Sequence, residues 1–281
     1  MPRFENLPLA TKEETVNYLK KNHGFHAALI GRSKHGKTSV AGSLTELFDN
    51  VEVLDTDGGT MSSNKQFQRV KNIAITPCKG VEDLANRVAQ TKADLLIVDS
   101  ISAALDQSKV ESIQGSKDNK NRRGKDQSIW QHANYANSLF IELSENIREV
   151  CRYRGKVVVS LCGVKDMWEQ DGTDRRYVGF RADLSAANAD KYNHACDMFL
   201  GQVREPTKWV DPSDGLTKWN YEELRYLTIL KPTPSWHFVG FRASTSFTNK
   251  IPPEINNFNL ARFLRAFVYD INNPVIEKEK I

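Results

Sequence analysis

The sequence lacks the features that define several other classes of protein. It has four cysteines, which are Cys78, Cys151, Cys162 and Cys196. None of them forms a CxxC pair, so a disulfide framework or a zinc site is not expected. No hydrophobic run is long enough to cross a membrane, and the first residues, MPRFENLPLATKEE, contain no signal-peptide core. We therefore expect a reduced globular protein of the cytoplasm.

Composition sets few other limits, but the location of the charge is informative. Charged residues make up 26% of the 281 residues and hydrophobic residues 40%, as in an ordinary α/β protein. The net charge is +4, and the segment GSKDNKNRRGK at 115–125 has five cations against Asp118, an excess equal to that of the whole chain. We expect this segment to be an exposed loop. Its cations are Lys117, Lys120, Arg122, Arg123 and Lys125.

The segment AALIGRSKHGKTSVAGSLTELF, residues 27–48, has the pattern of a phosphate-binding P-loop. Gly31 and Gly36 enclose four residues, after an apolar run and before a helical pattern. Glycines let successive backbone N–H groups approach phosphate oxygens. Lys37 can reach the β- and γ-phosphates, and the Thr38 hydroxyl can bind Mg²⁺. The expected contacts are Gly31, Arg32, Ser33, Lys34, His35, Gly36, Lys37, Thr38 and Ser39.

A second motif completes a nucleotide site. LLIVD at 95–99 is an apolar strand that ends in an aspartate, which is the Walker B pattern. Alone it is a weak signal. On a separate strand, 62 residues after Lys37, it is a strong one. We assign Asp99 to Mg²⁺.

Strands alternate with helices along the first two thirds of the chain, which predicts a doubly wound, mostly parallel α/β sheet. Expected strands are 26–30, 51–57, 72–76, 93–100 and 156–163, and expected helices are 12–21, 37–48, 80–91 and 127–152. Residues 164–195 are expected to be mostly loop with a short helix. Near the C-terminus we expect a strand pair, 226–231 with 237–243, and a helix at 259–271. The expected domains are an N-terminal helical extension (1–24), an ATPase core (25–205) and a C-terminal extension packed on it (206–281).

A GTPase is an alternative, because DTDG at 55–58 and TKAD at 91–94 match parts of its signature. The order and spacing argue against it. DTDG begins only 18 residues after Lys37, which leaves no room for a switch loop and a strand. TKAD precedes the strand LLIVD, whereas a base-reading loop should follow a strand.

GRSKHGKTS, VLDTDGG and LLIVDSISAAL together resemble the RecA-like recombinase core, over about residues 25–205. More narrowly, the layout is similar to phage-encoded RecA-like ATPases of single-strand annealing and recombination, which implies a host cytoplasm. The resemblance implies ATP, Mg²⁺ and homo-oligomers, as rings or filaments. It also implies Asp57 as the acid that polarises water, one methylene shorter than the usual glutamate. Hydrolysis is therefore expected to be slow. The strand 156–163 ends without the Gln or His that often senses the γ-phosphate in relatives.

The resemblance also implies single-stranded DNA binding through two loops, here 105–126 and 164–195. The first contains the basic segment. The second combines Arg175 and Arg176 with Trp168 and Tyr177, suited to phosphates and unstacked bases. Within residues 165–181 it also holds four acids, Asp166, Glu169, Asp171 and Asp174, so it is no simple cationic patch. The alternative is a nucleotide-gated assembly or scaffold protein that hydrolyses little and binds a protein partner. Turnover that DNA stimulates would favour the ATPase.

Overall fold

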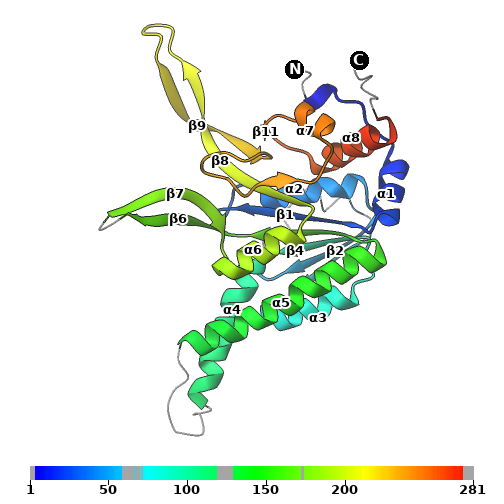
Figure 1. Cartoon of the computed structure of the whole chain (residues 1–281), viewed down its shortest axis with the longest axis vertical. Helices are drawn as coiled ribbons and strands as arrows, with labels where there is room; N and C mark the ends of the chain where they lie inside the picture. The colour runs from blue at the N-terminus through cyan, green and yellow to red at the C-terminus, as the bar shows by residue number, and fades with distance from the viewer. Residues whose placement is uncertain are drawn as a thin grey trace, which may run out of the picture.

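The doubly wound α/β fold is confirmed by a computed structural model, which describes residues 4–58, 67, 70, 72–118, 129–171 and 174–274 (Figure 1). The central sheet has the order β11-β9-β8-β1-β5-β4-β2-β3, and β10 also pairs with β8. The six strands from β8 to β3 are parallel to one another. β9 and β10 pair antiparallel with β8, and β11 pairs antiparallel with β9. The parallel strands are β1 (Phe25–Gly31), β2 (Asn50–Asp55), β3 (Asn72–Pro77), β4 (Leu95–Asp99), β5 (Val157–Cys162) and β8 (Met198–Val210).

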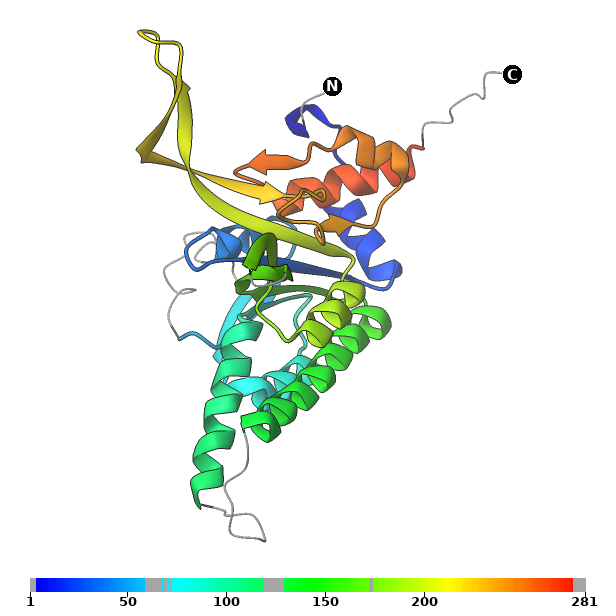
Figure 2. The ribbon, with the colours of Figure 1, turned by 60° about the vertical axis from the view of Figure 1, so that its left-hand side comes forward.

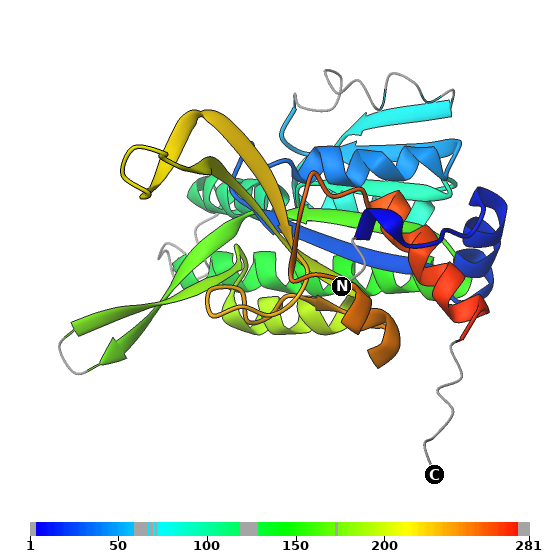
Figure 3. The same ribbon diagram turned by 90° about the horizontal axis from the view of Figure 1, so that it is seen from above.

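Helices cover both faces of the sheet, because successive side chains of a buried strand point to opposite faces. On β1, Ala27 and Leu29 pack into the core on one face, while Ala28 and Ile30 pack into the core on the other. The first face carries α1 (Lys12–Lys21), α2 (Lys37–Gly42), α7 (Thr245–Lys250) and α8 (Leu260–Asn272). The second carries α3 (Gly80–Gln90), α4 (Ile101–Asp118), α5 (Ile129–Arg154) and α6 (Ala186–Ala195) (Figure 3).

The two ends of the described chain pack together. Thr11 and Glu14 form the expected capping box at the start of α1. The Ala10 N–H donates to the Arg265 carbonyl of α8 at 3.0 Å. The expected helix near the C-terminus is present as α8. The boundary expected at 205/206 falls inside β8, so the division into core and C-terminal extension stays a prediction.

The expectation of mostly loop at 164–195 was wrong. Residues 164–182 form an antiparallel hairpin of β6 (Val164–Asp171) and β7 (Asp174–Ala182), and only the short helix, α6, was expected. Many charges hid the pattern, because both strands project into water and have no buried face to impose an apolar alternation. The dipeptide Asp171-Gly172 was the usable signal, since Asp-Gly is typical of hairpin turns.

A strand pair near the C-terminus is present, as expected, but the residues that pair differ from those expected. β9 (Thr217–Ile229) contains most of 226–231, but it pairs with β8 and with β11 (Glu254–Asn256). Within 237–243 only β10 (Gly240–Phe241) is a strand, and it pairs with β8. Strand β8 was missed because Pro206 and several charges interrupt its pattern. Figures 1 and 2 show β8 and β9 continuing beyond the sheet as a long ribbon.

A third correction concerns the first expected DNA-binding loop. Residues 101–118 are helix α4, so the part of the predicted loop 105–126 that the structure describes, 105–118, is helical. Ile101, Ala104, Leu105 and Ser108 are buried at helical spacing, and this period was the missed signal. Residues 119–128 lie outside the described residues. Among the helices that the structure describes, none is long and apolar enough to cross a membrane.

Candidate nucleotide-binding site

The P-loop joins the carboxyl end of β1 to the start of α2, as the motif requires. Its two glycines serve different purposes. A Cβ on Gly31 would lie 2.6 Å from the carbonyl oxygen of Gln202, so only glycine allows β1 to pack this closely against β8. Gly36 has a φ of 86°, a conformation that side chains rarely adopt. The sequence therefore fixes the turn that precedes the first N–H groups of α2.

Lys37 is held inside this turn. Its Nζ donates to the carbonyl oxygens of Gly31 at 2.7 Å and Arg32 at 2.9 Å. Burial lowers the pKa of Lys37, while the charge of Asp99 opposes the shift. The ammonium group thus has a fixed position at the centre of the loop, where a phosphate group would meet it.

Thr38 and Asp99 bring a hydroxyl and a carboxylate together. Thr38 Oγ1 donates to Asp99 Oδ2 at 3.1 Å. The pKa of Asp99 is raised to about 6. Burial is the main cause and the charge of Asp57 adds to it, while the hydrogen bond from Thr38 acts in the opposite direction. Both oxygens suit Mg²⁺, which usually takes one or two protein oxygens together with water and phosphate. The described residues contain no cluster of three or more metal-binding side chains, so these two oxygens would hold Mg²⁺ only with such additional ligands.

Asp55 and Asp57 have different roles in the turn that follows β2. Asp55 Oδ1 accepts from the N–H groups of Asp57 at 3.0 Å and Gly58 at 2.9 Å, so Asp55 caps the turn. The carboxylate of Asp57 lines the pocket. Loss of surrounding water there raises its pKa, as does Asp55, while Lys37 lowers it. Asp57 therefore joins the cap only through its backbone N–H, and its side chain takes no part in it.

These elements surround one open pocket of about 1400 Å³. Every residue that the sequence assigns to nucleotide, catalysis or metal lines it: residues 31–39, Asp57 and Asp99. The structure thus brings the assigned residues together, and their roles stay predictions. Sequence reasoning missed other residues of the wall, because no motif marks them as part of a nucleotide site. These include Ser102, Lys165, Asp183, Gln202 and Tyr226.

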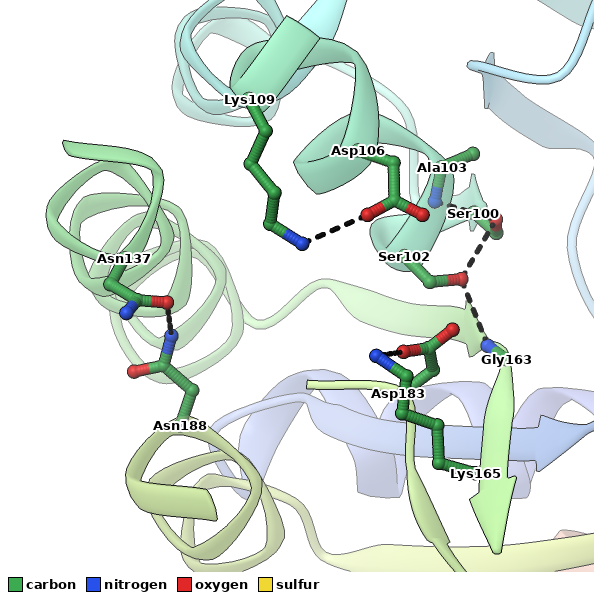
Figure 4. Close-up of polar contacts among 10 residues, drawn as sticks. All are labelled: Ser100, Ser102, Ala103, Asp106, Lys109, Asn137, Gly163, Lys165, Asp183 and Asn188. Carbon is green, nitrogen blue, oxygen red and sulfur yellow. Dashed lines mark hydrogen bonds and ion pairs between the residues drawn. The ribbon is translucent and has the colours of Figure 1, made fainter. Parts of the chain in front are cut away.

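The wall beyond Asp99 is a polar cluster, drawn in Figure 4. Ser102, at the start of α4, accepts a hydrogen bond from the Gly163 N–H at 2.9 Å. Lys165 on β6 forms an ion pair with Asp183, which follows β7. Ser160 is not part of this wall. It lies within β5, where its side chain is fully buried and hydrogen bonded to His26 and Tyr192.

The GTPase-like segment TKAD lies at the wrong edge of the sheet. Asp94 precedes the amino end of β4, where it pairs with Lys20 and Lys156. The P-loop follows the carboxyl end of β1, which is parallel to β4 through β5. A segment at the amino edge does not face a base bound at the P-loop.

The β6–β7 hairpin, whose base lines the pocket at Lys165 and Asp166, presents basic and aromatic groups farther along its strands. Arg175 and Arg176 are exposed on β7. Trp168 and Tyr177 lie opposite one another in the hairpin, with ring centroids 5.4 Å apart, and both are exposed. Of the other predicted DNA contacts, Lys117 lies in α4, where the structure describes its backbone but not its side chain. Lys120, Arg122, Arg123 and Lys125 lie outside the described residues.

The β8–β9 ribbon has a different surface. Its outer half exposes aromatic groups, among them Trp209, Trp219 and Tyr221. Lys218 pairs with Asp211 and Asp214. The other three cations of β8 and β9 also have partners inside the ribbon, because Arg225 pairs with Glu205 while Arg204 and Lys208 lie over the rings of Tyr226 and Trp219. Such a surface suits a protein partner better than a phosphate backbone.

Comparisons with known proteins place these features in context. The sequence model of a family described as AAA domain matches residues 23–236. No curated protein matches the chain. Among solved structures, the crystal structure of the RadB recombinase is similar, with 14% sequence identity and a TM-score of 0.40. The match covers 73% of this chain and 81% of that one.

Proposed function

The chain belongs to the AAA domain family, and from this premise we propose that it is an ATP-dependent, RecA-like protein that binds single-stranded DNA in recombination or annealing. The observation that supports ATP most strongly is that the P-loop, Asp57 and Asp99 line the same pocket. A lysine and a hydroxyl at the start of a helix, facing a buried carboxylate, suit Mg²⁺-bound triphosphate.

In this proposal each group has one task. The backbone N–H groups of the P-loop and Lys37 bind the phosphates. Thr38 and Asp99 hold Mg²⁺, which would neutralise charge that develops on the phosphates. Asp57 accepts a proton from the attacking water, since its carboxylate lines the same pocket and has no part in the turn cap. Its short side chain fits the expectation of slow hydrolysis.

We assign DNA binding to the β6–β7 hairpin together with the basic segment at 115–125. Arginines suit phosphates, and the exposed Trp168–Tyr177 pair offers faces on which bases can stack. Arg122→Ala with Arg123→Ala tests the basic segment. If that double variant keeps its DNA affinity across a salt series, the hairpin alone carries the binding.

The proposal includes assembly of several copies as a ring or filament, as the resemblance to RecA-like proteins implies. Light scattering with and without ATP·Mg²⁺ tests this part. A protein that stays monomeric in both conditions while it hydrolyses ATP would remove assembly from the proposal.

A second candidate function is a nucleotide-gated assembly or scaffold protein. The observation in its favour is the β8–β9 ribbon, which exposes Trp209, Trp219 and Tyr221 and holds Lys218 and Arg225 in ion pairs within itself. Such a protein would bind ATP, hydrolyse little of it and show no response to DNA.

The experiment that tests the first candidate is ATP binding by calorimetry, followed by phosphate release, in the whole chain. Lys37→Ala removes the central cation, and Lys21→Ala on α1 is the matched control at an exposed site. We expect the wild type and the control to bind and hydrolyse ATP and Lys37→Ala to do neither. Equal binding and turnover by all three proteins would show that the site is misassigned.

A further inference from the structure

A lysine–aspartate ion pair on the pocket wall has no role in the assignments above. We propose that Lys165 leaves Asp183 to contact the γ-phosphate of ATP, so that this pair distinguishes ATP from ADP. The inference rests on the proposed function, because it requires ATP at the P-loop. It supplies a γ-phosphate contact on a chain whose β5 strand ends without a Gln or His.

The position of Lys165 is set by its neighbours. It is the second residue of β6, and it lines the same pocket as the P-loop. The next residue, Asp166, pairs with Arg32 of the P-loop at 3.2 Å. This contact places the start of β6 directly beside the phosphate-binding turn.

The junction that carries Lys165 is also fixed relative to Asp99. The Gly163 N–H donates to Ser102 Oγ, and the Asp183 N–H donates to the Gly163 carbonyl, both at 2.9 Å. A Cβ on Gly163 would lie 3.1 Å from the Cβ of Asp183. Close packing therefore holds Asp183 against the end of β5 and leaves the lysine side chain as the mobile partner.

The charges of the phosphate site and of the ion pair act on a common neighbour. Burial, and after it the charge of Asp183, raises the pKa of the Cys162 thiol to about 12, while Lys37 lowers it. Lys37 and Asp183 also line the same pocket, and the Asp183 N–H is hydrogen bonded to Gly163, the residue that follows β5. A γ-phosphate in front of Lys37 would arrive beside the ion pair.

The exchange of partners is chemically reasonable for this pair. The Lys165 side chain is 51% exposed and has a flexible four-carbon stem, so it can move without opening the core. A terminal phosphate carries more negative charge than one carboxylate and offers more acceptor oxygens. Asp183, with a side chain 27% exposed, would keep contact with water after the lysine leaves. ADP has no γ-phosphate, so the ion pair would persist with ADP.

Other polar groups at the end of β5 do not compete for this role. Ser160 is fully buried and hydrogen bonded to His26 and Tyr192. Cys162 is also fully buried. Lys165 is the first charged side chain after β5 that lines the pocket.

The test compares the affinities of AMP-PNP·Mg²⁺ and ADP·Mg²⁺ for the whole chain by calorimetry. Lys165→Met keeps the length of the side chain and removes its charge. We expect it to weaken AMP-PNP binding about tenfold or more, as for the loss of one charged hydrogen bond, and to leave ADP binding unchanged. Lys165→Arg should restore the preference. Lys218→Met, which removes an ion-paired lysine of the β8–β9 ribbon, is the control and should change neither affinity.

Asp183→Asn separates sensing from a structural ion pair. If Lys165 reads the γ-phosphate, loss of its competitor should preserve or increase the preference for AMP-PNP. If Asp183→Asn and Lys165→Met reduce the preference equally, the pair is structural and the inference is overturned. A wild type that binds both nucleotides equally, or a Lys165→Met protein that keeps the preference, overturns it as well while leaving the nucleotide site intact. A wild type that binds neither nucleotide overturns the proposed function and this inference with it.

Discussion

The most quantitative prediction is that Asp99→Asn stabilises the protein in the absence of nucleotide and metal. The structure raises the pKa of Asp99 from 3.8 to about 6, chiefly through burial. The folded state therefore binds a proton more tightly than the unfolded state, and the ionised carboxylate costs stability at neutral pH. Asparagine has a similar shape, can still accept the Thr38 hydrogen bond and carries no charge.

The size of the effect follows from the pKa shift. At pH 7 the shift corresponds to about 3 kcal/mol. The cost falls as pH decreases through the folded pKa, because the wild-type carboxyl group then becomes protonated. At pH 5 the cost is roughly half of its value at pH 7. The stability advantage of Asp99→Asn should thus be about half as large at pH 5 as at pH 7.

Urea denaturation at both pH values, with EDTA and without nucleotide, measures this difference. Asp94→Asn is the matched control of opposite sign. Burial alone would raise the pKa of Asp94, but the hydrogen bonds and charges of Lys156 and Lys20 lower it overall. That variant should lose stability at both pH values, since the wild-type carboxylate stays ionised at both. Two results would refute the reasoning. One is an Asp99→Asn protein that is less stable than the wild type at pH 7, and the other is a stability advantage over the wild type that has the same size at pH 5 and pH 7.

The remaining predictions concern ligands. Lys37→Ala should abolish ATP binding in calorimetry while Lys21→Ala does not, and an unaltered titration would contradict this. Asp57→Asn should keep ATP binding and lower the steady-state rate of phosphate release about 100-fold, because it removes the proposed base; normal turnover would exclude that role. Arg175→Ala with Arg176→Ala should weaken single-stranded DNA binding in fluorescence anisotropy and flatten the log–log salt slope by about 1.4; an unchanged slope would argue that neither arginine contacts phosphate.

The shared pocket of the candidate nucleotide-binding residues was predictable because their motifs are local in sequence. The P-loop needs glycine at two defined positions and a lysine at the start of a helix, and all lie within nine residues. Asp99 was found because it ends a buried apolar strand, and the carboxyl ends of parallel strands meet at one edge. Alternation of strands and helices then predicted the sheet that brings Asp57 to the same pocket.

The rest was not predictable because it depends on contacts between segments far apart in sequence. Lys165 and Asp183 meet only because β6 and β7 form a hairpin, and nothing in either segment marks the pair. Tyr226 reaches the pocket because β9 adds to the edge of the sheet beside β8, and its ring packs against Gly36. The β6–β7 hairpin and the β8–β9 ribbon also extend beyond the core, where no buried face imposes an apolar pattern.

The measurement that tests the central claim most directly is the rate of Mg²⁺-dependent ATP hydrolysis by the whole chain, with and without single-stranded DNA. The account predicts slow turnover that rises when DNA is added and is absent in Lys37→Ala. The same low rate with and without DNA would contradict the DNA-coupled ATPase and favour the scaffold. No turnover and no ATP binding under either condition would contradict the nucleotide site itself.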